Sequence, residues 1–146
     1  MKKLNYSISI NVNKETVWNT MLNSGTYTKW AKAFSPESQY EGEWKQGSLM
    51  KFFDPNLGGT VAFIEKIKLY EHIHAKHVAV IDKDGNEDRD SETAKKWIGV
   101  RESYRFSEDN GVTELLVDIN THEEFVRMFD DSWPEALRLL KDLCEA

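Results

Sequence analysis

Hydrophobic residues near the end of the chain recur with the spacing of an amphipathic helix. The apolar positions between Phe125 and Glu145 lie three and four residues apart. Residues with this spacing share one face of a helix, and such a face has to be covered by another element. Pro134 lies inside the pattern and has no backbone N–H, so we expect a kink or a restart near Ser132 and Trp133. The apolar face consists of Val126, Phe129, Trp133, Leu137 and Leu140.

Most of the chain before this helix alternates between apolar and polar residues, which is the period of a β-strand with one buried face. Glycines mark the turns between the alternating segments. The pattern predicts an antiparallel meander of six to seven strands. The predicted strands are residues 4–12, 40–44, 48–54, 60–70, 72–81, 97–107 and 112–121.

Two short helices are predicted between the first strand and the second. Asn13 is a suitable N-cap for a helix over residues 14–22, which Ser24 and Gly25 then interrupt. A second helix is expected over residues 26–32. The chain therefore begins with one strand followed by a helical pair.

The predicted elements form a single domain over residues 1–146. Its fold class is α+β, with a curved antiparallel sheet and a long C-terminal helix packed across it. The acidic connection over residues 82–96 is long, and we expect it to be mobile. A long helix that closes a curved sheet often leaves a cavity, so ligand binding is the leading functional hypothesis.

Composition excludes several classes of function and partner. The net charge is -6, and the basic residues are scattered along the sequence, so we expect no nucleic-acid partner. No segment approaches the ~18 apolar residues of a membrane span, and the first ten residues alternate like a strand, unlike an export signal. The single Cys144 excludes an internal disulfide and a Cys-rich zinc site. We expect a cytoplasmic protein without membrane insertion.

Several local strings resemble one known family. The segment "VWNTMLNSGTYTKWAKAFSPES" is similar to a V-W…Y-x-x-W…F-x-P-x-S pattern, and "GEWKQGS" to a G-x-W-x-x-G-S turn. The segment "WIGVRESYRFSEDNGVTELLVDINTHEEF" is similar to a W-x-x-x-x-E-x-Y strand followed by a G-x-T-x-L strand, and "FDDSWPEALRLLKDLCE" to the final helix. These patterns are those of the family related to the activator of the heat-shock-protein-90 ATPase, a branch of the SRPBCC or START-like superfamily.

This resemblance implies a helix-grip fold over nearly the whole chain. The co-chaperones of that name resemble this sequence only in their C-terminal domain, and their separate N-terminal domain has no counterpart here. Other members of the superfamily bind lipids, sterols, hormones or polyketides, and a minority are enzymes. Because one fold hosts all of these activities, the resemblance does not select among them.

Polar residues on the apolar faces of three predicted strands are candidates for a ligand site. Alternation places Glu102 on the same side as Tyr104 and other apolar residues, His77 on the apolar side of its strand, and Glu65 on the same side as Phe63. Such groups could orient the polar end of a ligand or act as acid and base. They could also be tied to structural partners, as Glu102 would be by a bond to His77, or be turned outward by a β-bulge.

Aromatic residues near these polar groups have two interpretations. They line a cavity in one, and they belong to a filled core in the other. The aromatic candidates for ligand binding are Tyr104, Phe53, Phe63, Trp97, Phe129 and Trp133.

The sequence offers little support for a metal or a cofactor, and we expect neither. His72 and His74 point the same way on one strand, but no third ligand can be named. Counting an EF-hand from Asp82 puts Glu87 at the glycine position and Thr93 at the closing glutamate, so a calcium loop is excluded. There is no G-x-S-x-G motif, so an enzyme here would use acid and base alone.

Three functional hypotheses follow. The first is a non-enzymatic protein that binds a small apolar or amphipathic molecule between the sheet and the C-terminal helix, with Glu102 and His77 orienting its polar end. The second is a cyclase-like or hydrolase-like enzyme using the same cavity. The third is a protein-interaction module like the co-chaperone. A monomer and a homodimer are both compatible with the sequence.

Overall fold

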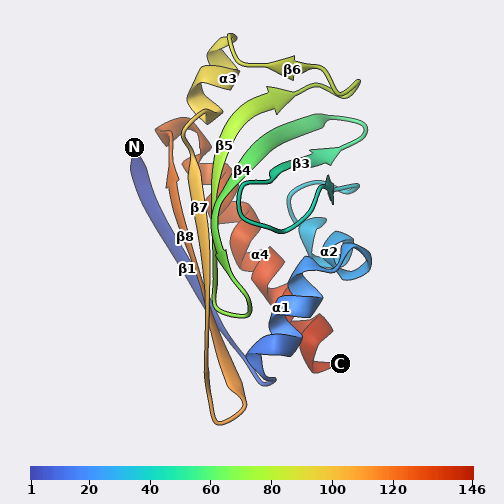
Figure 1. The fold of residues 1–146 in the computed structure, drawn as a ribbon, viewed down its shortest axis with the longest axis vertical. Coiled ribbons are helices and arrows are strands. Elements are labelled where there is room, and N and C mark those ends of the chain that lie inside the picture. The colour runs from blue at the N-terminus through green and yellow to red at the C-terminus, as the bar shows by residue number, and fades with distance from the viewer.

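The computed structural model describes residues 1–146 and contains one curved sheet with helices on its concave side (Figure 1). The strands are β1 (Lys2–Ile10), β2 (Gln39–Glu41), β3 (Leu49–Asp54), β4 (Gly58–Lys68), β5 (His72–Ile81), β6 (Glu87–Asp88), β7 (Arg101–Asp109) and β8 (Val112–Thr121). The helices are α1 (Lys14–Leu22), α2 (Ser24–Ala31), α3 (Glu92–Trp97), the 3-10 helix η1 (Glu123–Phe125) and α4 (Val126–Glu145).

The sheet is antiparallel, and its main path has the order β1-β8-β7-β5-β4-β3-β2. The first strand pairs with the last, and the short β6 pairs with β5 away from the main path. This arrangement confirms the predicted α+β architecture. The sheet has 8 strands, which is more than the six to seven predicted. The additional strand is the two-residue β6 in the connection after β5.

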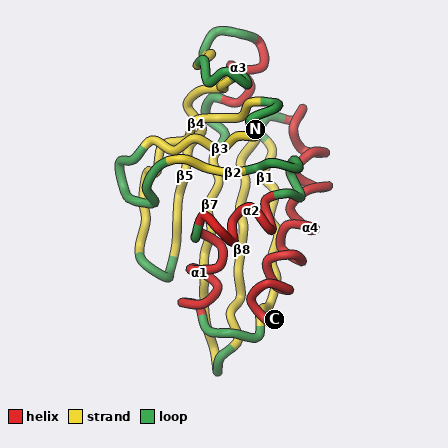
Figure 2. Tube along the Cα trace, turned by 90° about the vertical axis from the view of Figure 1, so that its right-hand side faces the viewer, coloured by secondary structure: helices red, strands yellow, loops and turns green.

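The C-terminal helix α4 crosses the concave face, as Figure 2 shows from the side, together with α1 and α2. Phe129, Trp133, Leu137 and Leu140 are buried, which confirms most of the predicted apolar face. The predicted restart near Pro134 is wrong, because α4 continues through this residue. Proline removes one backbone donor, and that loss alone does not end a helix held by a large buried face.

Asparagine side chains begin both short helices. Asn13 accepts a hydrogen bond from the backbone N–H of Thr16 at 2.8 Å, and Asn23 accepts one from Gly25 at 2.9 Å. Each side chain satisfies a donor that the first turn of a helix leaves unpaired. The indole N–H of Trp30 donates to the carbonyl of Met21 at 3.0 Å, so α1 and α2 are held together beside the sheet.

The connection after β5 contains structure of its own. It forms β6 and then α3, whose N-cap Ser91 accepts a hydrogen bond from Ala94 at 3.1 Å. The prediction that a strand begins at Trp97 is wrong, since Trp97 is the last residue of α3 and β7 begins at Arg101. Gly99, with φ 95°, provides the left-handed turn that separates the helix from the strand.

Two register shifts interrupt the pairing of β4 with β5. One lies between Val61 and Ala62, and the other between Ile64 and Lys66. The first leaves an extra residue, Val78, in β5, and the second leaves an extra residue, Glu65, in β4. The bulge at Glu65 allows Ile67 to pack against the core although Phe63 lies on the other face, so the single face predicted for Phe63, Glu65 and Ile67 is wrong.

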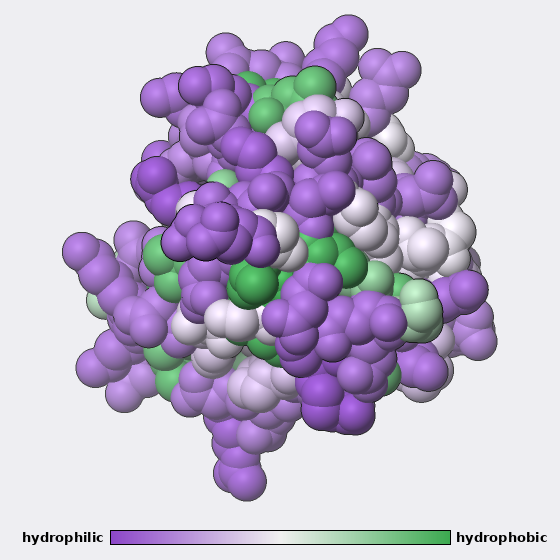
Figure 3. Space-filling model, turned by 90° about the horizontal axis from the view of Figure 1, so that it is seen from below, coloured by the Kyte–Doolittle hydropathy of each residue, from purple (hydrophilic) through white to green (hydrophobic).

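The outer surface is predominantly hydrophilic in the view from below, with apolar side chains in separate patches (Figure 3). Large exposed apolar residues are scattered among distant segments, which is ordinary for a folded domain. They are Met1, Leu49, Leu57, Leu69 and Val112. None of the helices combines the length and the apolar character that crossing a bilayer requires.

Candidate functional site

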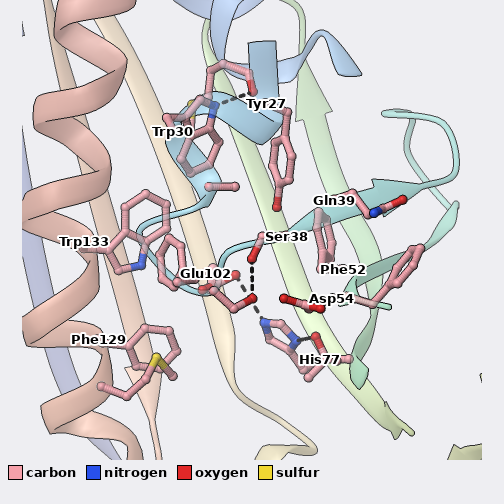
Figure 4. A pocket seen from close by; sticks show the side chains of 18 of the residues that line it. Tyr27, Trp30, Ser38, Gln39, Phe52, Asp54, His77, Glu102, Phe129 and Trp133 are labelled. Carbon is pink, nitrogen blue, oxygen red and sulfur yellow. Dashed lines mark hydrogen bonds and ion pairs between the residues drawn. The ribbon is translucent and has the colours of Figure 1, made fainter. Parts of the chain in front are cut away.

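A cavity of about 220 Å³ lies between the concave face of the sheet and the helices. Of its 23 lining residues, 14 are hydrophobic, and they come from segments between Met21 of α1 and Trp133 of α4 (Figure 4). An apolar cavity with a few polar groups at one end is the usual form of a small-molecule site.

Aromatic rings form a large part of the wall and hold one another in place. Trp133 of α4 stacks on Trp30 of α2 with ring centroids 5.9 Å apart, and Tyr104 of β7 lies 5.7 Å from Trp133. Tyr27 meets Tyr40 edge to face at 4.9 Å. These contacts fix the rings at the geometries that aromatic pairs prefer, so the wall is built before any ligand enters.

A chain of hydrogen bonds forms the polar end of the cavity. His77 of β5 lies between Thr60 and Glu102, with Nδ1 2.9 Å from Thr60 Oγ1 and Nε2 3.2 Å from Glu102 Oε2. Tyr104 donates its hydroxyl to the same Oε2 at 3.3 Å. Because a carboxylate only accepts, Nε2 carries a hydrogen in this arrangement. The sequence prediction that Glu102 and His77 face one interior is confirmed by this geometry.

Two tyrosines stay neutral in this environment. Burial raises the pKa of Tyr104 well above its usual range, and the negative charge of Glu102 raises it further. Burial likewise raises the pKa of Tyr27, with the Glu102 charge as the second cause. Both hydroxyls therefore keep their protons at every physiological pH, and that of Tyr104 remains a donor to Glu102.

Two indole N–H groups in the wall have no hydrogen-bond partner. They belong to Trp44 and Trp133, and both nitrogen atoms are buried. Neither nitrogen is exposed to the open space of the cavity, so the two indoles contribute their apolar rings to the wall.

Asp54, at the end of β3, holds the loops around the cavity. Its carboxylate accepts hydrogen bonds from the backbone N–H of Asn56 at 2.8 Å and of Glu37 at 3.0 Å. The Asn56 hydrogen bond is the main reason that the pKa of Asp54 lies below its usual range. Asp54 therefore joins the segment before β2 to the turn after β3.

Most residues predicted from the sequence line this cavity. They are Glu102, His77, Tyr104, Phe53, Trp97, Phe129 and Trp133. Phe53 also packs against a separate cluster formed by Val61, Ala79 and Ile81. Glu65 and Phe63 are absent from the lining, and Glu65 instead pairs with Arg101, with Arg101 Nε 3.1 Å from Glu65 Oε1.

Sequence reasoning missed several important residues of the site. Thr60 was not considered, because uninterrupted alternation along β4 places it on the face opposite Val61 and Phe63, away from the expected interior. Tyr27, Trp30 and Trp44 were read only as parts of helices or turns. The resemblance contained a signal for them, since all three aromatic residues stand within its quoted strings.

His72 and His74 lie beside each other on β5, with ring centroids 5.1 Å apart. No group of three or more His, Cys, Asp or Glu side chains is placed to hold a metal ion. Neither histidine lines the cavity.

Neither a protein-family model nor a curated protein sequence matches this chain. Solved structures do match its fold. The Aha1 dimer from Colwellia psychrerythraea superimposes with a TM-score of 0.75 at 20% identity, covering 99% of this chain and 97% of that one. CalU16 from Micromonospora echinospora matches with a TM-score of 0.66 at 13% identity, covering 97% and 73%.

DynU16, a protein of the dynemicin biosynthetic locus, matches with a TM-score of 0.74 at 10% identity. The match covers all of this chain and 48% of DynU16, so this chain spans about half the length of that protein. Identities this low carry information about the fold alone. The chain has the helix-grip fold of these proteins: a curved antiparallel sheet, short helices after the first strand, and a long C-terminal helix across the sheet.

Proposed function

We propose that this protein binds a small apolar or amphipathic molecule in the cavity between the sheet and α4. The cavity itself carries the proposal, because apolar side chains form most of its lining and a hydrogen-bonded set of polar groups lies at one end. A filled core would leave no space of this size, because protein interiors pack with few voids larger than a water molecule.

The size of the cavity limits the ligand. At about 220 Å³ it exceeds the ~150 Å³ that accommodates benzene in an engineered core, and it is smaller than the ~300 to 1,000 Å³ of typical drug-sized sites. A molecule with two fused rings or a short chain therefore fits, whereas a sterol would not be enclosed. Indole is a suitable neutral probe, because its planar body matches the aromatic wall.

Native mass spectrometry of the purified protein, compared with the denatured sample, tests for a molecule released on unfolding. A titration with indole, followed by calorimetry, tests the cavity directly. We expect the variant Ser38→Phe to weaken indole binding at least ~10-fold, because Ser38 lines the cavity and the larger ring occupies it. The matched variant Ser107→Phe changes an exposed position of β7 and should bind indole like the unchanged protein.

Absence of a released molecule together with absence of indole binding would contradict the proposal. Equal loss of binding in Ser38→Phe and Ser107→Phe would also contradict it, since the second residue lies outside the cavity. Circular dichroism of both variants shows whether each is folded.

A second candidate is an enzyme that uses acid and base in the same cavity. It is favoured by the pairing of His77 with Thr60 and Glu102, which resembles a base held between a hydroxyl and an orienting carboxylate. The two candidates differ in the variant Glu102→Gln. An enzyme would lose turnover while it retained the binding of a neutral ligand, whereas a binding protein has no turnover to lose.

The relationship to the activator of the heat-shock-protein-90 ATPase remains a proposal about this chain, as does a role in protein interaction. It rests on the quoted sequence strings and on the similarity to the Aha1 dimer at 20% identity. A monomer, a homodimer and a cytoplasmic location likewise remain predictions.

A further inference from the structure

The charges around the cavity have one sign. Its ionisable lining residues are Glu102, Asp54, His77, Tyr27 and Tyr104, and no lysine or arginine is among them. The chain contains 19 lysine and arginine residues, so their absence is a local property of this site. A ligand carboxylate would enter without a cation to meet it, and two carboxylates would repel it.

The two acidic residues differ in their availability. Both oxygens of Asp54 accept backbone hydrogen bonds, so this carboxylate is engaged in holding the loops. Glu102 uses only Oε2, which accepts from His77 and Tyr104, and its Oε1 has no partner. Its side chain is 14% exposed, and Figure 4 shows it projecting among the lining residues near Trp133 and His77. One carboxylate oxygen is therefore free to meet a donor inside the cavity.

The surroundings of Glu102 are those that favour an organic cation. Aromatic faces attract cations, and the attraction grows when water is excluded. The rings that line the cavity are Tyr27, Trp30, Phe34, Trp44, Phe52, Phe53, Trp97, Tyr104, Phe129 and Trp133. An aromatic wall around a carboxylate with one unpaired oxygen combines the two features that bind amines.

We propose that the ligand is a small amphipathic amine, whose protonated nitrogen meets Glu102 Oε1 and whose planar apolar body lies among the rings of α2, β3 and α4. This inference rests on the proposed binding function and names the ligand class.

Three probes that share an indole ring and differ in the charge of the side chain test the proposal by calorimetry at pH 7. They are tryptamine, which is cationic, tryptophol, which is neutral, and indole-3-propionate, which is anionic. We expect tryptamine to bind about tenfold more tightly than tryptophol, and indole-3-propionate to bind more weakly than either.

The variant Glu102→Gln keeps the shape of the side chain and removes its charge. We expect it to lower tryptamine affinity to that of tryptophol, while tryptophol affinity changes less than about threefold. The variant Glu108→Gln is the control, because Glu108 lies six positions further along β7, is exposed and does not line the cavity. It should preserve the preference for tryptamine.

The outcomes separate this inference from the proposed function. Binding of indole and tryptophol without any preference for tryptamine would overturn the inference and leave the cavity as a binding site. Failure of indole and of all three probes, with no molecule released on unfolding, would overturn both. If Glu102→Gln does not fold, the order of the three affinities in the unchanged protein still decides.

Discussion

At the scale of single residues, Tyr104 connects the aromatic wall to the polar end of the cavity. Its ring packs on Trp133, its hydroxyl donates to Glu102, and its side chain is buried. Burial and the charge of Glu102 both oppose ionisation of the phenol, which is why its pKa is raised. Ionisation of this single side chain at alkaline pH therefore lowers the stability of the fold.

The sign of that dependence follows from proton linkage. A tyrosine whose pKa is raised on folding keeps its proton in the folded state after the unfolded state has lost it. Its stabilising contribution is complete below about pH 10 and decreases as the pH rises toward the folded value. We expect the free energy of unfolding to fall more steeply above about pH 10 in the unchanged protein than in Tyr104→Phe, by up to ~1.4 kcal/mol per pH unit.

Urea unfolding between about pH 8 and pH 11 measures this difference in slope. The other tyrosines are present in both proteins, so the difference reports Tyr104 together with its electrostatic interaction with Tyr27. Identical slopes in the two proteins would show that the hydroxyl of Tyr104 ionises equally easily in the folded and unfolded states.

Residue-level predictions succeeded where strands alternate without interruption. Glu102 and Tyr104 stand on β7, whose pairing with β8 is regular, and both reach the cavity as the period of two indicates. Glu65 and Phe63 stand on β4 near its register shifts, and both point elsewhere. A β-bulge depends on pairing with another strand, so the sequence of one strand does not reveal it.

At the scale of elements, the hairpin of β3 and β4 forms one side of the cavity and depends on a very close approach at Gly59. A Cβ atom on Gly59 would lie 1.9 Å from the carbonyl oxygen of Phe52 and 2.6 Å from the Cα of Phe53. Both neighbours are backbone atoms, which cannot rotate away as a side chain would. Only glycine allows the strands to pair at this distance.

We expect Gly59→Ala to lower the free energy of unfolding by at least about 1 to 3 kcal/mol, because β3 and β4 must separate to admit the methyl group. Gly25→Ala is the control. Its Cβ would meet only the side-chain oxygen of Asn23 at 3.4 Å, and alanine in a helix is up to about 1 kcal/mol more favourable than glycine. Equal unfolding midpoints in urea for the two variants would contradict the argument.

Helix α3 was predictable from local signals that the strand interpretation overrode. Ser91 followed by Glu92 and Thr93 is a good helix start, and Gly99 follows the helix at a position suited to its end. The apolar residues after Trp97 instead suggested a strand that began too early. The consequence is functional, since α3 places Trp97 at the cavity and against Phe125, with ring centroids 4.4 Å apart.

At the scale of the whole molecule, the cavity exists only when distant segments are assembled. Met21, Phe52, His77, Tyr104 and Trp133 all line it, although they span most of the chain. The order of strands and helices was predicted from alternation and from the family resemblance. The volume of the cavity was not predictable, because it is the small remainder left after large side chains pack, and a change of one side chain fills or opens it.

Because no part of the chain forms the cavity alone, a ligand held there should stabilise the entire domain. Linkage predicts that tryptamine at about 100 times its Kd raises the free energy of unfolding by ~2.7 kcal/mol. For a chain of this length the corresponding rise in Tm is roughly 5 to 10 °C. Calorimetric melts with tryptamine measure it, and Ser38→Phe, in which the added ring occupies the cavity, should show little change. A probe that binds with a measured Kd and leaves Tm unchanged would bind the unfolded chain as tightly as the folded one. The cavity between the sheet and α4 would then not be its site.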